Sequence, residues 1–153
     1  LNTNYFDVMM LAFSIMNQNA KKEILPKTIS KNIGTMSMFV VRSLFSIKGR
    51  LKQDIDRLVK NKHLPEWLLD EKEPLEYFLK DSGANNIIDA CYRYVRHQKG
   101  IDTVLFGTGD IDHLKKNIRS IVNSKLSDEC INKFNQYFSH LKGVGLDFPE
   151  RNK

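Results

Sequence analysis

The sequence has few cysteines and no long apolar run. Its 153 residues include two cysteines, Cys91 and Cys130, which are too few for a disulfide framework and are typical of a reducing compartment such as the cytoplasm. No apolar stretch approaches the ~18 residues of a membrane-spanning helix. Hydrophobic residues make up 41% and charged residues 27% of the chain. This balance predicts a water-soluble globular domain with no membrane partner.

The residues that most often bind metals or attack substrates show no suggestive spacing. The four histidines, His63, His97, His113 and His140, lack the paired arrangement of a zinc site, so we predict no metal. Cys91 falls on the apolar face of a helix expected at about 84–97, and we therefore predict a core residue rather than a nucleophile.

Basic residues outnumber acidic residues, by 24 to 18, which gives a net charge of +6. Such a balance raises nucleic acid as a partner. The charges are interleaved, however, as in KGRLKQDIDRLVKNK (48–62), which is more typical of a solvated helix face. Arg93 lies between Tyr92 and Tyr94, but alternate residues of a helix do not share a face, so we expect core tyrosines and a solvated arginine. A nucleic-acid partner is therefore disfavoured. A non-catalytic basic module that binds nucleic acid or a protein partner stays open as the alternative function.

Apolar segments of strand length alternate with segments of helical periodicity. The strand candidates have no clean alternation of polar and apolar residues, so we expect both of their faces to be buried. They are 5–13 (YFDVMMLAF), 35–41 (TMSMFVV) and 101–106 (IDTVLF). Helices are expected at about 19–32, from Leu51 onward, at 84–97, after Asp110 and at 127–140. This order predicts an α/β protein with a parallel sheet.

The segment IDTVLFGTGDIDHLKKNIRSI (101–121) carries the strongest local signal. A strand turns through Gly107, Thr108 and Gly109 directly into a helix for which Asp110 is a good N-cap. The glycines allow close approach of a ligand, and a helix N-terminus favours an anion. This pattern favours a phosphate site, although it matches neither the dinucleotide fingerprint nor a P-loop. An ordinary capped strand-to-helix turn is the other interpretation.

Most of the chain resembles the aldo/keto reductase family. The segment 101–121 resembles the last barrel strand of that family and the helix that follows it. Upstream, FDVMMLAFSIMNQ is similar to the sixth strand and IGTMSMFVVRSLF to the seventh, and NIIDACYRYVRHQKGIDTVLFG resembles the helix that leads into the eighth. Two positions depart from the common family form. Met10 stands where Gln is frequent, and Lys116 where Glu often precedes Asn117.

The resemblance implies a (β/α)8 TIM barrel that binds NADP(H) at its C-terminal face. On this basis Asn117 contacts the adenine edge, and His113 flanks the adenosine 2′-phosphate, with charge from Lys115 or Lys116. The residues expected against the 2′-phosphate itself are Gly107, Thr108, Gly109 and Asp110.

The resemblance also implies cofactor contacts at the end of the second strand candidate. Phe39 corresponds to an aromatic residue that stacks on nicotinamide, and Arg42 and Ser43 correspond to the pyrophosphate loop. In the intact enzyme a hydride passes from nicotinamide to the carbonyl carbon of a small substrate, and a Tyr supplies the proton.

The chain is too short to form such a barrel alone. A complete barrel takes about 250 residues and eight strands, whereas this sequence has three strand candidates and begins at Leu1. We therefore expect residues 1–153 to form the C-terminal part of the family domain, without its N-terminal half. The family's catalytic Asp, Tyr, Lys and His have no counterparts here, so no catalytic residue is assigned. An open barrel leaves unpaired strand edges, which favour self-association.

Overall fold

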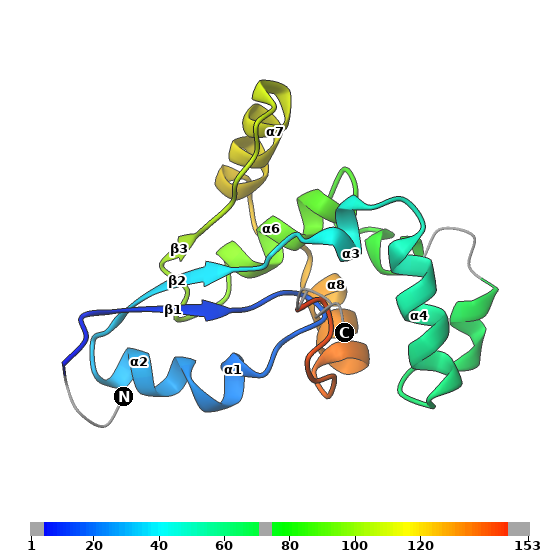
Figure 1. Ribbon diagram of the computed structural model, residues 1–153, viewed down its shortest axis with the longest axis horizontal. Helices are drawn as coiled ribbons and strands as arrows, with labels where there is room; N and C mark the ends of the chain where they lie inside the picture. The colour runs from blue at the N-terminus through cyan, green and yellow to red at the C-terminus, as the bar shows by residue number, and fades with distance from the viewer. Residues whose placement is uncertain (1–4, 71–74, 147–153) are drawn as a thin grey trace, which may run out of the picture.

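The computed structural model describes residues 5–70 and 75–146. Three parallel strands and the helices that connect them form an α/β fold (Figure 1). The sheet strands are β1 (Val8–Ala12), β2 (Gly34–Met38) and β3 (Thr103–Val104). The helices are α1 (Ala20–Glu23), α2 (Leu25–Ser30), α3 (Ser43–Ser46), α4 (Arg50–Lys60), the 3-10 helix η1 (Glu66–Leu69), α5 (Glu76–Leu79), α6 (Ile87–Arg96), α7 (Ile111–Val122) and α8 (Asp128–Phe138).

The sheet has the order β1-β2-β3, and both pairs of neighbours are parallel. Met10 pairs with Met36, which in turn pairs with Thr103. The parallel sheet predicted from the alternation of strand and helix segments is thus confirmed. The third strand is shorter than the predicted 101–106, because only Thr103 and Val104 lie in the ladder.

Polar contacts hold β3 beside β2 where the ladder is short. Thr35 donates its hydroxyl to the carbonyl oxygen of Gly100 at 2.5 Å, and its backbone N–H donates to the Asp102 carboxylate at 2.7 Å. The Asp102 N–H donates back to the Thr35 hydroxyl at 3.1 Å. These bonds take up backbone groups that would otherwise continue the ladder, which explains why the strand begins only at Thr103.

The helix predicted at 19–32 is divided into two. α1 ends at Glu23, and α2 begins at Leu25 with Pro26 in its first turn. Proline has no N–H to donate, and its ring collides with the carbonyl four residues earlier, so a continuous helix cannot pass this point.

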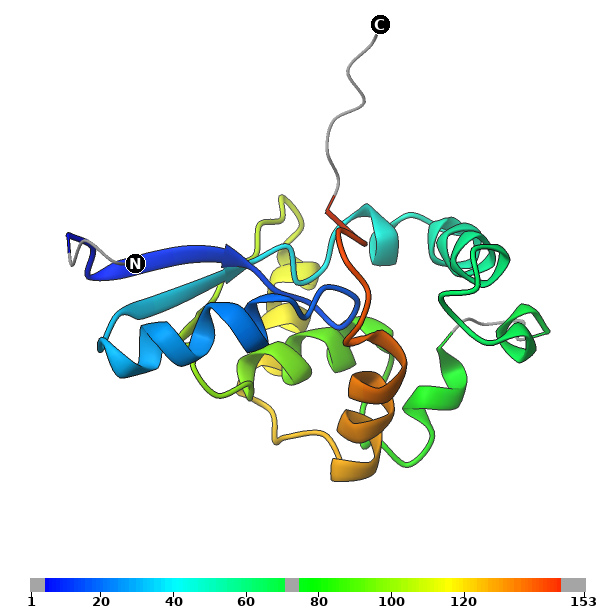
Figure 2. The same cartoon turned by 90° about the horizontal axis from the view of Figure 1, so that it is seen from below.

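Helices α1, α2, α6 and α8 lie on one side of the sheet (Figure 2). On β1, Leu11 points to that side and is 6% exposed, whereas Val8 and Met10 are 52% and 50% exposed. On β2, Thr35 and Ser37 are buried, and Met36 and Met38 are half-buried. The prediction that the strands are buried on both faces is therefore wrong for β1. Its residues are apolar on both faces, but helices cover only one.

The core beneath the sheet includes a cluster of aromatic rings from α5 and α8. The ring of Phe78 lies 5.7 Å from that of Phe134 and 5.1 Å from that of Phe138. Trp67 of η1 stacks edge-on against Tyr77 at 4.9 Å. Of the helices described, none is long and apolar enough to cross a membrane.

Candidate functional site

The loop between β3 and α7 ends in a capped helix start. The Asp110 carboxylate accepts hydrogen bonds from the backbone N–H groups of Asp112 at 2.9 Å and His113 at 2.8 Å. The Asp110 N–H donates to the Thr108 hydroxyl oxygen at 3.1 Å. The prediction that Asp110 is the N-cap is confirmed, and the hydrogen bond from His113 is the main reason that the pKa of Asp110 is lowered.

The cap limits what the helix start can offer to an anion. The sequence predicted that backbone amides at the start of this helix could bind a phosphate. Two of these amides, those of Asp112 and His113, already donate to the Asp110 carboxylate. Thr108 accepts from Asp110 and still has its own hydroxyl proton to donate. Gly107 and Gly109 are exposed, and a Cβ built on either meets no atom within 4 Å. An approaching ligand therefore meets the glycine backbone and the Thr108 hydroxyl.

A cavity of about 720 Å³ opens beside this loop. Its size lies within the usual range for small-molecule sites. One wall comes from the loop and α7: Gly107, Thr108, His113, Lys116, Asn117, Arg119, Ser120 and Asn123. The other walls come from α6 with the segment before it and from α3 with the segment before it: Asn85, Asn86, Ile88, Asp89, Tyr92, Val41, Phe45 and Ser46.

The cavity wall formed by α7 is basic. Lys116 and Arg119 are cationic and exposed, and His113 lies one turn before them. Lys115, the other lysine considered from the sequence, does not line the cavity. It lies 3.9 Å from the carboxylate of Asp112. The structure thus separates two adjacent lysines that the sequence could not distinguish.

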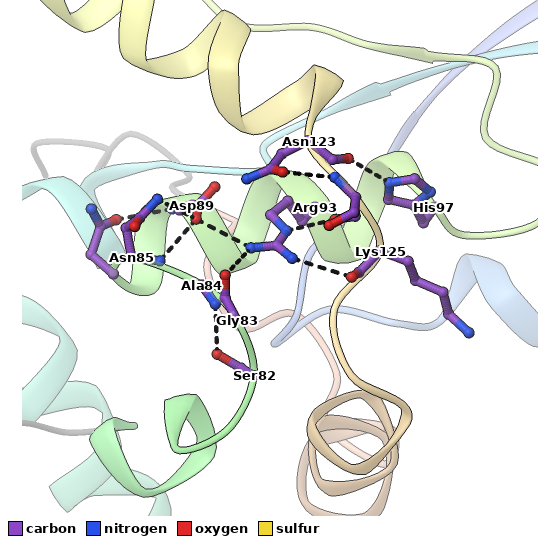
Figure 3. Close-up of polar contacts among 11 residues, drawn as sticks. Ser82, Gly83, Ala84, Asn85, Asp89, Arg93, His97, Asn123 and Lys125 are labelled. Atoms are coloured by element: carbon purple, nitrogen blue, oxygen red, sulfur yellow. Dashed lines mark hydrogen bonds and ion pairs between the residues drawn. The ribbon is translucent and has the colours of Figure 1, made fainter.

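Among the described residues one carboxylate lines the cavity, that of Asp89, and it is already engaged (Figure 3). It accepts from the Asn85 backbone N–H at 2.9 Å and from the Asn85 side-chain amide at 3.2 Å. Its third partner is the Arg93 guanidinium, at 3.5 Å. Because Asp89 is 4% exposed and paired, its negative charge is largely compensated before any ligand arrives.

Arg93 also ties together the two sides of the cavity. It donates to the carbonyl oxygens of Gly83 at 2.5 Å, Ser124 at 2.7 Å and Lys125 at 3.2 Å (Figure 3). Gly83 precedes α6, whereas Ser124 and Lys125 follow α7. The expectation that Arg93 is solvated is wrong. The residue is 2% exposed, and three carbonyls and a carboxylate replace the water that its guanidinium loses.

The second predicted cofactor segment lies outside the cavity lining. Phe39 follows β2 with a left-handed φ of 65°, and the Arg42 guanidinium lies 4.4 Å from the centre of its ring. Ser43 is the first residue of α3. The cavity is lined instead by Val41 and Phe45 from this part of the chain. Gly109 and Asp110 also lie outside the lining, whereas Gly107, Thr108, His113 and Asn117 belong to it.

Sequence reasoning missed the wall opposite α7. Asn85 and Asn86 precede α6, and Tyr92 lies within it. Asn86 caps α6 by accepting from the Asp89 N–H at 3.0 Å, and an Asn just before an apolar helix was the available signal. Burial raises the pKa of the Tyr92 phenol to about 12, so this group remains a neutral hydroxyl at ordinary pH.

Cys91 and the histidines give the cavity no further chemistry. Cys91 is fully buried, as predicted, and burial raises its thiol pKa far above the ordinary value. Within residues 5–70 and 75–146, no group of three or more His, Cys, Asp or Glu residues is arranged to hold a metal ion. What the site offers is a basic, amide-rich pocket with two aromatic side chains, suited to a flat ligand that carries negative charge.

The chain was compared with known families and proteins. The model of the aldo/keto reductase family matches residues 3–137. Among curated proteins, no sequence matches at a significant level.

Solved structures show the same fold. The aldo-keto reductase AKR11C1 from Bacillus halodurans is similar in its holo form, with a TM-score of 0.58 and 11% identity. Its apo form is similar with a TM-score of 0.58 and 10% identity. Both comparisons cover 95% of this chain and 48% of that chain, so the chain spans about half the length of these structures. The three parallel strands and their helices match that part of an aldo-keto reductase TIM barrel. With the family model matching most of its length, the chain belongs to the aldo/keto reductase family.

Proposed function

We propose that the chain contributes the adenosine 2′-phosphate end of an NADP(H) site to a carbonyl-reducing enzyme of this family. In this proposal residues 1–153 are the C-terminal part of the family domain, and the catalytic acid and base are supplied by the other part of the barrel. When bound, the cofactor supplies the hydride for reduction of a small carbonyl substrate. The observation that carries the proposal is the cavity beside the loop at 107–109, with its basic wall.

The residues of the cavity suit the two ends of an adenosine 2′-phosphate. The Thr108 hydroxyl, Lys116 and His113 supply hydrogen-bond donors for the phosphate, and Lys116 also supplies positive charge. The side-chain amide of Asn117 has both a donor and an acceptor for the adenine edge. The rings of Phe45 and Tyr92, which line the opposite walls, offer flat apolar surfaces for the base.

The charge distribution favours NADP over NAD. The 2′-phosphate is the group that distinguishes the two cofactors, and it would lie against a wall with two exposed cations and a histidine. The carboxylate on the other side, Asp89, is compensated by Arg93. A second phosphate-binding interpretation, a basic surface for nucleic acid, predicts no such preference.

The test is calorimetric titration of the chain with NADP⁺ and NAD⁺. We expect saturable binding that prefers NADP⁺. Lys116→Ala should weaken NADP⁺ binding by roughly three- to tenfold, because one screened, charge-assisted contact is lost. Thr108→Ala and Asn117→Ala should each weaken it by a similar factor. Lys115→Ala is the matched control, because it removes the same charge from the neighbouring position outside the cavity.

Equal losses in the two lysine variants would contradict the proposal, since they would indicate attraction to net charge alone. A steep dependence on salt with no preference between NADP⁺ and NAD⁺ would favour the nucleic-acid interpretation instead.

The open edges of the sheet lead to a second part of the proposal, which concerns self-association. Because β1 and β3 each pair only with β2 among the described strands, each has an edge whose backbone groups lack a strand partner. We propose that these edges lead to self-association of the chain.

A further inference from the structure

The two oxygen atoms of the Asp89 carboxylate have different surroundings (Figure 3). Oδ2 accepts from the Asn85 backbone N–H at 2.9 Å and from the Asn85 side-chain amide at 3.2 Å, and it lies 3.5 Å from the Arg93 guanidinium. Oδ1 accepts no hydrogen bond from any residue that the structure describes. One oxygen of the carboxylate is thus committed to the protein, and the other has acceptor capacity left.

The unpartnered oxygen of Asp89 is open to the cavity. Across the part of the chain that the structure describes, the one fully buried side-chain oxygen or nitrogen without a hydrogen-bond partner is Oε1 of Gln18. Oδ1 of Asp89 also lacks a partner, so it is not fully buried. Asp89 is 4% exposed and lines the cavity. An unsatisfied acceptor in so buried a carboxylate favours a ligand that brings a hydrogen-bond donor.

The Asp89 carboxylate is held in place and its charge is compensated by Arg93. The guanidinium of Arg93 donates to the carbonyl oxygens of Gly83, Ser124 and Lys125, which fix its own position. Because the ion pair offsets the negative charge, the carboxylate repels a phosphate elsewhere in the cavity only weakly. Oδ1 therefore selects a ligand by its hydrogen-bond donor rather than by its charge.

The other polar groups of the cavity wall are weaker acceptors. The side-chain oxygen of Asn86 already accepts from the Asp89 N–H at 3.0 Å, and that of Asn123 accepts from the Ser124 N–H at 2.9 Å. The amide of Asn117 is neutral and can present either its oxygen or its nitrogen to a ligand. An ionised carboxylate accepts more strongly than an amide and has no proton to donate.

The surface beside Asp89 is apolar and suits a flat base. Ile88, Asp89 and Tyr92 all line the cavity, and their spacing of three and four residues places them on one face of α6. The Tyr92 ring and the Ile88 side chain offer apolar area, and Oδ1 offers the acceptor next to it.

We propose that Asp89 determines which base the cavity accepts, by accepting a hydrogen bond at Oδ1 from the 6-amino group of a purine. This inference rests on the proposed adenosine 2′-phosphate site and deepens it. The amino group supplies the N–H donor that Oδ1 lacks. A 6-oxo purine held by the same 2′-phosphate places a carbonyl oxygen there instead, and the two acceptors repel each other. The cavity is therefore specific for a 6-aminopurine nucleotide.

The first test uses the wild-type chain and three nucleotides that differ only at position 6 of the purine. Calorimetric titration compares adenosine 2′-phosphate, the 6-oxo analogue inosine 2′-phosphate and the analogue with hydrogen at that position. Adenosine 2′-phosphate should bind about tenfold or more tightly than the hydrogen analogue, because the latter loses a hydrogen bond to a charged group. The 6-oxo analogue should bind most weakly. Recognition by Asn117 alone would not give this order, since an amide can turn its nitrogen toward a 6-oxo group.

The second test replaces the carboxylate. Asp89→Asn retains the shape of the side chain and an acceptor for Asn85, but its amide can serve either purine. The preference for adenosine 2′-phosphate over inosine 2′-phosphate should shrink to roughly threefold or less. Asp112→Asn is the matched control, because it removes the same charge from an exposed position outside the cavity lining, and it should retain the full preference. Circular dichroism verifies folding, and the wild-type series decides the question even if Asp89→Asn does not fold.

Equal affinities for the three nucleotides would overturn this inference and leave the proposed function standing, because the 2′-phosphate would still be bound. An Asp89→Asn chain that binds all three more weakly by the same factor would also overturn it, since that result indicates a structural role alone. A wild-type chain that binds none of the three overturns the proposed site together with this inference.

Discussion

The two faces of the sheet differ more than their sequences do. On β1, Leu11 is 6% exposed and its neighbour Met10 is 50% exposed, although both are apolar. Beneath the sheet, Leu11 belongs to a core that continues through the aromatic rings of α5 and α8. On the opposite face, Val8, Met10, Met36 and Met38 have no covering element among the described residues. The comparison teaches that one half of a barrel can complete its outer layer of packing alone, whereas its interior depends on other strands.

The candidate site combines one wall that is packed into the core with one wall that is exposed. Its α6 wall is part of the completed core, because Asp89 and Arg93 are buried and paired with each other, and Arg93 also donates to three loop carbonyls. Its α7 wall is mostly exposed. Arg93 links the two, since its carbonyl partners lie before α6 and after α7. A buried arginine therefore joins the segments on the two sides of the cavity, whereas the loop that gave the sequence signal belongs to the exposed wall.

The largest expected effect on stability tests the packed α6 wall of the cavity. Arg93→Ala should lower the free energy of unfolding by about 3–5 kcal/mol, because it leaves the buried Asp89 carboxylate without its ion-pair partner. Urea denaturation followed by circular dichroism measures this loss. Arg96→Ala, an exposed position on the same helix, serves as the control and should change stability by less than about 0.5 kcal/mol. A loss below about 1 kcal/mol for Arg93→Ala would contradict the role given to this residue.

The next effect compares the two faces directly on one strand. Leu11→Ala should cost about 2–5 kcal/mol, because it opens a cavity in a packed core. Met10→Ala should cost less than about 1 kcal/mol in the monomer, since half of Met10 is already exposed. Urea denaturation of the two variants, at a low protein concentration, measures the difference. Equal costs for both variants at low concentration would show that the two faces are packed alike.

The sequence predicted the position of each strand but not the cover of each face. The segments at 5–13 and 101–106 contain β1 and β3, and the segment at 35–41 overlaps β2, which begins one residue earlier at Gly34, because continuous apolar runs of this length are typical of parallel strands. Such an apolar run does not indicate whether a second layer of structure covers the other face of the strand. Val8 and Met10 have the apolar character of barrel interior, and only the rest of the fold decides whether they are covered.

Which site residues could be predicted also depends on whether their contacts are local in the sequence or made through the fold. Asp110 and the glycine loop were recognisable because capping and loop chemistry are local, set by a few adjacent residues. Arg93 was expected in solvent, because its neighbours in sequence say nothing of Gly83, Ser124 or Lys125, which reach it through the fold. The contribution of Asn85 and Phe45 to the cavity was unpredictable for the same reason: it depends on how α6, α3 and α7 meet.

The smallest effect concerns the cap of α7, on the exposed side of the comparison. The hydrogen bond from the His113 N–H, followed by the nearby charge of His113, lowers the pKa of Asp110 below its ordinary 3.8. A lowered pKa in the folded state means that the charged cap stabilises α7 above pH 3.8, and that this contribution disappears as the pH falls through the lowered pKa. Asp110→Asn retains a capping side chain but cannot titrate. We therefore expect the protection of the His113 amide from hydrogen exchange, relative to its intrinsic rate at each pH, to fall on acidification in the wild type and to fall less in the variant. Protection in the middle of α6 provides the internal reference. If both proteins respond alike at His113, then the acid sensitivity of α7 comes from its exposed apolar side chains, such as Ile111, Ile118 and Val122, and not from its cap.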